Sequence, residues 1–379
     1  MHKRSLKETK YNIADPVALL PCSEYDSAAV RAALDEGLKL LGDHGIIGRP
    51  GERVLLKPNL LRAAPPEAAV TTHPVVVEAA IGAVRSAGAE PVVGDSPSYG
   101  NFERLAEVSG LAEVCRKHEV PIFALDDPVP LQVDGGAKFR RLEVARAVLE
   151  VDRIVNLAKA KTHQQMLLTL GVKNLFGCVV GFEKARWHLK AGTDARHFAR
   201  MIAELAAAVG ADLTLLDAVV GMDGDGPGGG RVRPMGFLAL GRNPFAVDVV
   251  AAELFGVPPK RVPVLTAGRE LGLAPARAAD VEILGVGDWR ELAIPDFRLP
   301  GTASVGWSLP GPIFRFVKRL FTPQPTIDRE RCALCGACVD VCPTDAMTNA
   351  GGRIEISYRD CISCYCCAEV CPHNSINIR

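Results

Sequence analysis

RVLLKPNLLRAAPPEAAVTTHPVVVEAAIGAVRSAGAEPVVGDSP, residues 53–97, is the stretch that decides the fold class of this chain. Its first five residues, Arg53–Lys57, are mostly apolar and predict a short buried strand, and residues 90–94 predict a second one. Residues 74–87 predict a helix between them, because proline stands at the favoured first position and Gly88 follows the last turn. Strand, helix and strand in this order predict a βαβ unit with parallel strands.

Strand and helix patterns continue to alternate as far as residue 285. Further strands are predicted at 121–125, 153–158, 213–216, 236–240 and 279–284, and further helices at 101–118 (with a break near Gly110), 195–209 and 243–256. Such alternation is typical of α/β proteins. We therefore predict a large domain with a mostly parallel sheet flanked by helices.

Eight of the twelve cysteines form two copies of one pattern near the C-terminal end, 29 residues apart and each closed by proline. The spacing C-x2-C-x2-C-x3-C-P is typical of bacterial two-cluster ferredoxins, in which the fourth cysteine of each run binds the other cluster. We therefore predict two [4Fe–4S] clusters, one bound by Cys332, Cys335, Cys338 and Cys371 and the other by Cys361, Cys364, Cys367 and Cys342. A pair of zinc sites is the alternative, but zinc sites usually contain two C-x2-C units with a long gap, or histidine. Cys366 has no place in the pattern, and we interpret it as a buried spare thiol.

Composition and local sequence bound the domains and the location. We predict an N-terminal tail at 1–14, the α/β domain at 15–285, a linker rich in proline and glycine at 286–326, and a small α+β ferredoxin-like domain at 327–379. Within the linker, residues 313–321 predict a short packing helix or, as the alternative, a segment that touches a membrane surface. A net charge of zero argues against a general nucleic-acid binder. No apolar run reaches the ~20 residues of a membrane span and no secretory signal is visible, so we expect a cytoplasmic protein.

Polar residues follow the predicted strands of the α/β domain. In this order along the chain they are Lys57, Asn59, His73, Asp95, Lys161, His163, Lys173 and Asn174. Ligands bind at the carboxyl ends of strands in open α/β sheets. Lysines gathered there predict a pocket for an anionic small molecule. The alternative is a set of internal ion pairs, for example Lys57 or Lys173 with Asp95.

Residues 217–230 are rich in aspartate and glycine and follow a predicted strand. We expect them to be irregular, and they match neither a P-loop nor an EF-hand. Asp223 and Asp225 are candidates for binding a hard cation, or for accepting hydrogen bonds from a substrate or from the lysines. The alternatives are a closing lid, a backbone-lined anion site and an ordinary exposed loop.

These motifs occur together in one known family. The order LLKPNL (55–60), TTHP (71–74), VVGDSP (92–97), KAKTH (159–163), GVKNLFG (171–177) and GDGPGG (224–229) resembles the family described as domain of unknown function 362. Members of that family often carry a C-terminal two-cluster ferredoxin module. The resemblance covers roughly residues 15–285, and it implies that the ten polar residues named above share one site without giving each a role.

We predict an anaerobic-type iron–sulfur oxidoreductase. Single electrons from a ferredoxin or similar redox protein would pass through both clusters to or from an anionic substrate or cofactor in the α/β domain. The predicted catalytic group comprises Lys57, Lys161 and Lys173 as anion ligands, with His73 or His163 as proton donor. The predicted ligand-binding group comprises Asn59, Asp95, Asn174, Asp223 and Asp225.

Two other functions stay open. In the first, the α/β domain would bind a ligand or act as a scaffold, and the clusters of the C-terminal domain would serve docking or redox sensing. In the second, the α/β domain would be a non-redox enzyme. No G-x-G-x-x-G follows the first strand, so a dinucleotide bound in Rossmann style is unsupported.

Overall fold

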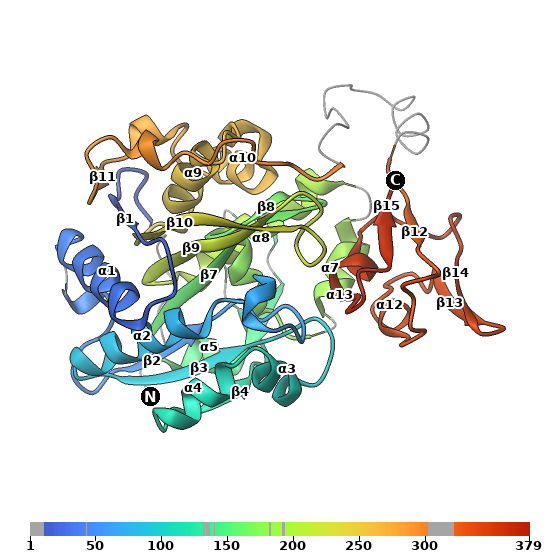
Figure 1. Cartoon of the computed structure of the whole chain (residues 1–379), viewed down its shortest axis with the longest axis horizontal. Helices are drawn as coiled ribbons and strands as arrows, with labels where there is room; N and C mark the ends of the chain where they lie inside the picture. Colours follow the sequence, from blue (N-terminus) through green and yellow to red (C-terminus); the bar gives the residue numbers. More distant parts are fainter. Residues whose placement is uncertain are drawn as a thin grey trace.

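The computed structural model describes residues 11–42, 44–131, 133, 137–139, 141–181, 183–191, 194–301 and 322–379. The predicted segment 313–321 and most of the predicted tail lie outside these ranges. Figure 1 shows a large α/β domain and, drawn in red beside it, a smaller C-terminal domain.

Nine strands of the described chain form one sheet in the order β11-β1-β10-β9-β7-β2-β3-β4, with β8 paired to β7. The strands are β1 (Val17–Pro21), β2 (Arg53–Lys57), β3 (Glu90–Asp95), β4 (Ile122–Ala124), β7 (Arg153–His163), β8 (Leu167–Thr169), β9 (Leu213–Asp223), β10 (Arg231–Gly241) and β11 (Ile283–Leu284). Five neighbouring pairs are parallel, and β10 and β8 make the antiparallel ones. The sheet is therefore mixed and mostly parallel, as predicted. A separate hairpin consists of β5 (Pro128–Leu131) and β6 (Leu142–Ala145).

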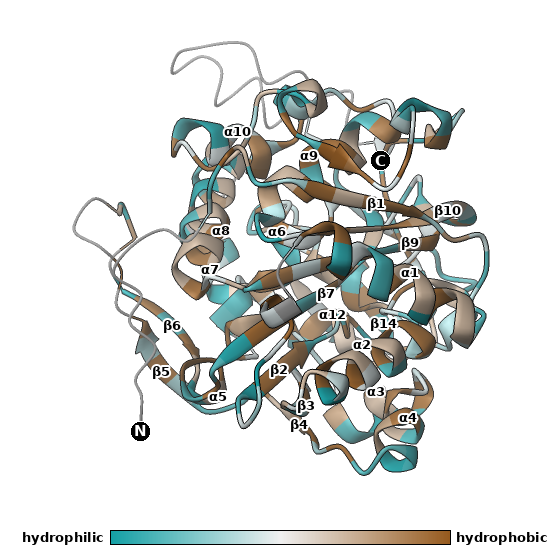
Figure 2. Ribbon diagram, turned by 90° about the vertical axis from the view of Figure 1, so that its left-hand side faces the viewer, coloured by the Kyte–Doolittle hydropathy of each residue, from teal (hydrophilic) through white to brown (hydrophobic). Residues whose placement is uncertain are grey.

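Helices cover both faces of this sheet (Figure 1). On β2, Leu55 packs into one apolar core, whereas Val54 and Leu56 pack into the other, because side chains alternate along a strand. One face carries α1 (Ser27–Leu40), α2 (Pro74–Ser86), α3 (Phe102–Val108) and α4 (Leu111–Lys117), and the other carries α5 (Arg146–Glu150), α6 (Gly171–Asn174), α8 (Ala195–Val209), α9 (Pro244–Leu254) and α10 (Pro263–Glu270). Figure 2 shows the strands between them as largely hydrophobic. Burial on both faces explains why the strands read as continuous apolar runs.

Capping residues fix several helix ends where the sequence indicated them. The Asn101 side chain accepts the N–H of Arg104 and starts α3, and Asn243 accepts the N–H of Phe245 and starts α9. Gly110 takes a left-handed conformation with φ 77° between α3 and α4, which explains the predicted break.

The expectation that residues 217–230 are irregular is wrong for its first half. Residues 217–223 belong to β9, where Val220 pairs with Pro234 and Asp223 with Arg231 of β10. Gly221 fits this pairing because a Cβ at that position would lie 2.5 Å from the Met235 side chain. Strands β7 and β10 are also longer than predicted, so that Lys161 and His163 lie on a strand.

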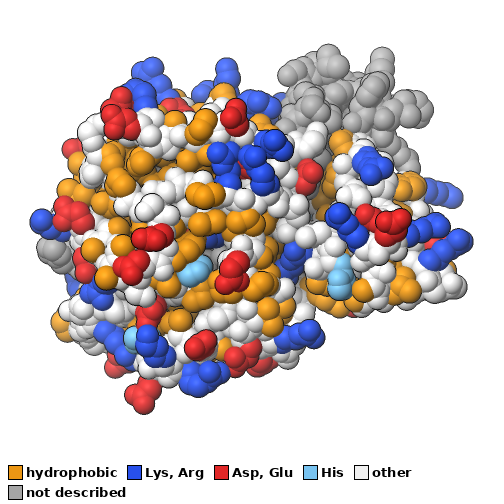
Figure 3. All heavy atoms as spheres, viewed as in Figure 1, with side chains coloured by type: hydrophobic (Ala, Val, Ile, Leu, Met, Phe, Trp, Pro, Cys, Tyr) orange, Lys and Arg blue, Asp and Glu red, His pale blue; other side chains and the backbone are white. Residues whose placement is uncertain are grey.

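The small domain consists of two short strand pairs and two short helices. They are β12 (Pro325–Ile327) with β15 (Ile376–Ile378), β13 (Met347–Ala350) with β14 (Arg353–Ile356), α12 (Ala337–Asp340) and α13 (Cys366–Val370). The predicted linker divides into parts, because Trp289, Leu292 and Phe297 pack against the core of the large domain. Figure 3 shows positive and negative side chains intermixed over the visible face of both domains. Among the described helices, none is both long and apolar enough to cross a membrane.

Candidate functional site

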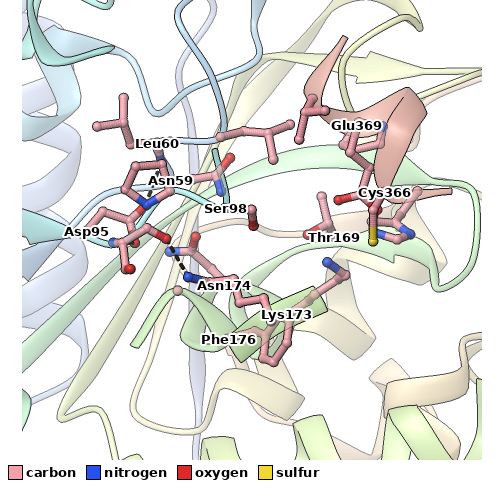
Figure 4. Close-up of a pocket in the computed structure, with 18 of the residues that line it drawn as sticks. Asn59, Leu60, Asp95, Ser98, Thr169, Lys173, Asn174, Phe176, Cys366 and Glu369 are labelled. Carbon is pink, nitrogen blue, oxygen red and sulfur yellow. Dashed lines mark hydrogen bonds and ion pairs between the residues drawn. The ribbon is translucent and has the colours of Figure 1, made fainter. Parts of the chain in front are cut away.

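A cavity of about 70 Å³ lies where the carboxyl ends of β2, β3 and β7 meet the small domain (Figure 4). Lys57 ends β2, Asp95 ends β3, and Lys161 and His163 lie at the end of β7. Because carboxyl ends of parallel strands share one edge of a sheet, these side chains converge. The small domain closes the cavity with Val341, Cys366, Glu369 and Val370.

The structure brings together seven of the ten predicted residues of the α/β site. The cavity is lined by Lys57, Asn59, Asp95, Lys161, His163, Lys173 and Asn174. It is also lined by Ser96, which follows the same strand as Asp95, and by Thr169, Lys184 and His188, which no motif in the sequence indicated. Lys184 and His188 come from α7 (Glu183–Ala191), a helix that the sequence analysis did not identify.

Lys57 and Asp95 form a buried ion pair. The Lys57 Nζ lies 2.8 Å from the Asp95 Oδ1, and both side chains are almost inaccessible to water. The backbone N–H groups of Leu60 and Ser96 also donate to the Asp95 carboxylate. Gly177 leaves room for this pair, since a Cβ there would lie 2.4 Å from both charged groups. The alternative of an internal ion pair therefore holds for Lys57.

Lys161 is buried without a carboxylate partner in the described part of the chain. Its Nζ donates to the Asn59 Oδ1 and to the Val70 carbonyl oxygen. Burial, and then the positive charges of Lys159 and Lys173, hold the pKa of Lys161 well below its ordinary value. An anion beside this ammonium group would favour its protonated form.

Lys173 and Lys184 are two further ammonium groups of the cavity. The Lys173 side chain forms no hydrogen bond or ion pair with any described residue, and its Nζ lies 5.9 Å from the centre of the Phe176 ring. In Figure 4 the Lys173 chain points toward Cys366 and Glu369. The Lys184 Nζ donates to the carbonyl oxygens of Ser96 and Val179, and burial lowers its pKa to about 7.

Glu369 projects from α13 of the small domain toward His163 of β7. The His163 Nδ1 accepts the backbone N–H groups of Gln165 and Met166, so the proton of the neutral ring lies on Nε2. That Nε2 lies 2.9 Å from the Glu369 Oε1, although the two atoms are not aligned for a hydrogen bond. Burial alone would raise the pKa of Glu369, but His163 and Lys173 lower it to about 2.

Three buried polar atoms on the cavity wall have no hydrogen-bond partner among the described residues. They are the His163 Nε2, the Glu369 Oε1 and the His188 Nδ1. Burial lowers the pKa of His188 to about 3, so that ring is neutral. The His163 Nε2 and the Glu369 Oε1 face each other at 2.9 Å, whereas the His188 Nδ1 faces no described polar group. Buried polar atoms in folded proteins nearly always have a partner, so the His188 Nδ1 indicates a place for a polar ligand or ordered water.

The other three predicted residues lie outside the cavity lining. His73 caps α2 and stacks on Tyr25 with ring centres 3.5 Å apart, beside the buried Lys159–Asp217 ion pair. Asp223 accepts hydrogen bonds from Arg231 and Arg233, with the Arg231 Nη2 at 2.7 Å.

Asp225 accepts the Gln164 side-chain amide at 3.3 Å. For Asp223 the sequence suggested a cation or a substrate as partner, but its carboxylate accepts hydrogen bonds from Arg231 and Arg233 instead. In the ranges that the structure describes, no three His, Cys, Asp or Glu side chains are placed to hold a single metal ion.

Cysteines from the two runs lie near one another in the small domain. A second cavity, of about 20 Å³, is lined by Cys342 together with Cys361, Cys364 and Cys367. The other set lies close enough for Cys371, Cys335 and Cys332 to act electrostatically on Cys338. Burial raises the pKa of the Cys338 thiol to about 11, so a thiolate there needs a cation beside it. Cysteines of both runs thus lie close together, as [4Fe–4S] ligands must, and their division into two sets of four stays a prediction.

Cys366 lines both cavities, a position that the sequence analysis missed when it treated this residue as a spare thiol. It lies on α13, next to Cys367 in the second set. One short helix therefore separates the polar cavity from a cysteine set.

Comparison with known proteins agrees with this architecture. Residues 324–372 match the family described as 4Fe-4S dicluster domain, so this part of the chain belongs to the iron–sulfur class and supports an electron-transfer role. Residues 54–253 match the family described as Domain of unknown function (DUF362). The chain belongs to this family, as its motifs predicted.

One relative and one solved structure extend the comparison. The "Thylakoid-associated protein sll1697" of Synechocystis sp. is 37% identical over 290 residues, which cover 75% of this chain and 87% of that protein. The lactate racemase apoprotein of Thermoanaerobacterium thermosaccharolyticum aligns with 12% identity and a TM-score of 0.37 over 54% of this chain. This chain spans about half of that structure, 51% of its length.

Proposed function

We propose that the protein is an oxidoreductase that exchanges single electrons between two [4Fe–4S] clusters and a small anion bound in the cavity. The position of Cys366 carries the proposal, because this residue lines both the polar cavity and the pocket of the second cysteine set. A bound [4Fe–4S] cluster supplies one-electron chemistry. A substrate in the cavity would thus lie on the other side of α13 from that chemistry.

The chain's own residues fit the remaining tasks. Lys173 has free N–H donors for an anion, and the His163 Nε2 holds a proton at the cavity wall. Val341 and Val370 exclude water on the side of the small domain. His163 is the proposed proton donor, because His73 does not line the cavity.

Electron exchange with a partner is proposed at the first cysteine set. Cys335 of that set is exposed, whereas Cys364 and Cys367 of the second set are buried. A redox protein would therefore approach the first set, and the second set would face the substrate. A cytoplasmic location remains part of the proposal.

Electron paramagnetic resonance tests this function. Protein purified without oxygen and reduced with dithionite is expected to show signals of two interacting [4Fe–4S]⁺ centres. Fractions of anaerobic cell extract are then added, and loss of the signal identifies the fraction that contains the oxidant. Two intact clusters that no fraction reoxidises would favour the scaffold or redox-sensing function, and turnover that is independent of reduction would favour a non-redox enzyme.

The substitution Lys173→Met separates substrate binding from cluster assembly. We expect unchanged resonance signals, but reoxidation by the active fraction at least about tenfold slower, since a hydrogen bond to a charged group contributes ~1.5–3 kcal/mol. Lys39→Met is the matched control, because the Lys39 side chain is 71% exposed on α1. Equal reoxidation rates in both variants would contradict the proposed position of the substrate.

A further inference from the structure

We propose that the cavity binds a small dianion, with Lys161, Lys173 and Lys184 as its counter-charges. This inference rests on the proposed function and deepens it, because it names the charge and size of the molecule that the cavity accepts.

The charge balance of the wall gives the first argument. Of the ionisable lining residues other than histidine and cysteine, four are lysines and two are carboxylates. Asp95 is neutralised by Lys57 at 2.8 Å. The remaining lysines are Lys161, Lys173 and Lys184, and the negative charge of Glu369 balances one of their three positive charges. Two positive charges in excess remain when all three are protonated, and a bound dianion would balance them.

Free donors give the second argument. An ammonium group has three N–H donors. Lys161 uses two of them on Asn59 and Val70, and Lys184 uses two on Ser96 and Val179. Toward the residues that the structure describes, each therefore keeps one donor, and Lys173 keeps all three. The oxygen atoms of an oxyanion would accept hydrogen bonds from these remaining N–H groups.

The volume gives the third argument. The cavity has a volume of about 70 Å³. On the same scale a buried water molecule needs roughly 10–15 Å³. The cavity therefore accommodates roughly five to seven non-hydrogen atoms. Sulfate and oxalate have this size.

Protonation of the lysines predicts how binding depends on pH. The charged and titratable groups that act on these three lysines are Lys57, Arg62, Asp95, Lys159, His163, Cys178, His188, Cys366 and Glu369, together with the lysines themselves. Burial is the largest cause of the lowered pKa in each lysine, so the ligand-free cavity sheds protons. A dianion restores them, and its affinity is expected to fall as the pH rises through about 7, the pKa of Lys184.

Titration calorimetry on the oxidised full chain tests the inference without any electron transfer. At constant ionic strength, oxalate and sulfate are expected to bind at least about tenfold more tightly than formate. Runs in buffers of different ionisation enthalpy are expected to show proton uptake on binding. Lys173→Met should weaken oxalate binding about 10- to 100-fold, and Lys39→Met should leave it unchanged.

Lys173→Met is the decisive variant, because the Lys173 side chain forms no hydrogen bond or ion pair with a described residue, and Glu369 keeps His163 beside it when the lysine is removed. Formate binding as tight as oxalate, absence of proton uptake, or equal oxalate affinity in both variants would overturn the inference. Oxalate binding with clusters that no extract fraction reoxidises would support it while contradicting the proposed redox function.

A separate observation concerns Arg62, which lies outside the cavity lining. Its side chain is 8% exposed and forms no ion pair with a described carboxylate. It donates to the carbonyl oxygens of Cys371 and Gly228 and to the Asn374 Oδ1. The charge of this arginine is permanent. Burial lowers the pKa of Arg62, and electrostatic attraction to the Cys371 sulfur opposes that lowering.

We infer that Arg62 raises the reduction potential of the cluster bound through Cys371, because a positive charge stabilises the more negative, reduced cluster. Potentiometric titration followed by electron paramagnetic resonance tests this. At a fixed potential, Arg62→Gln is expected to change the reduced-to-oxidised ratio of that cluster at least about tenfold, which is 59 mV for one electron. Arg62→Lys keeps the charge and should lie nearer to the wild type. Equal potentials in the two variants, with both clusters present, would reduce Arg62 to a packing role.

Discussion

Replacing Cys342 with alanine is expected to remove one of two clusters and to leave the other. Cys342 belongs to the first run in sequence but lines the pocket formed by three cysteines of the second run. A [4Fe–4S] cluster that loses one of its four thiolate ligands is labile. The other cluster keeps all four of its predicted ligands, Cys332, Cys335, Cys338 and Cys371. Iron is expected to fall from about eight to about four atoms per chain.

Iron and sulfide analysis of protein purified without oxygen measures this effect. Cys366→Ala is the matched control, since Cys366 lines the same pocket without belonging to the predicted ligands. We expect this variant to keep all of its iron. Full loss of iron in Cys342→Ala would argue for one interdependent centre, and loss of half the iron in Cys366→Ala would overturn the ligand assignment.

The substitution Asp95→Ala is expected to destabilise the large domain by about 3–5 kcal/mol, because it leaves the buried Lys57 ammonium without its carboxylate. It also removes the acceptor for the backbone N–H groups of Leu60 and Ser96. For a domain of this size the melting temperature should fall by roughly 6–20 °C.

Circular dichroism of the helical signal during heating measures the change. Asp35→Ala is a control with the same chemistry on the surface, since Asp35 pairs with Arg31 within α1 and is 50% exposed. We expect that control to lose no more than about 0.5 kcal/mol. The pair of substitutions Lys57→Met and Asp95→Ala should recover part of the loss. A fall no larger than in the control would show that the ion pair is not essential to the fold.

Local signals in the sequence were sufficient for much of the large domain. The βαβ unit was predictable because apolar runs, a proline at the first helical position and Gly88 lie within 45 residues of one another. Strands β7 and β9 were predicted too short, since the polar residues Lys159, Lys161 and Asp217 interrupt the apolar pattern. Burial of these charges is possible only through partners far away in sequence, such as the Lys159–Asp217 pair.

The cavity was predictable where it depends on strand ends, and unpredictable where it depends on packing. Lys161 and His163 follow from the position of β7 in the sheet. Glu369 and Cys366 come from the small domain, and only the docking of the two domains brings them to the same wall. Asp223 was predicted to bind a ligand because the sequence does not show that β9 pairs with β10, the strand that carries its partners Arg231 and Arg233.

Helix α13 places a limit on how this protein can be re-engineered. Residues 366–370 contribute a cysteine of the second set on one side and cavity wall on the other. A ferredoxin that has the cysteines but lacks Glu369 and Val370 would leave the cavity without part of its wall. A chimeric protein must therefore keep residues 366–370 together with the large domain, so the C-terminal domain cannot be exchanged independently of the large domain.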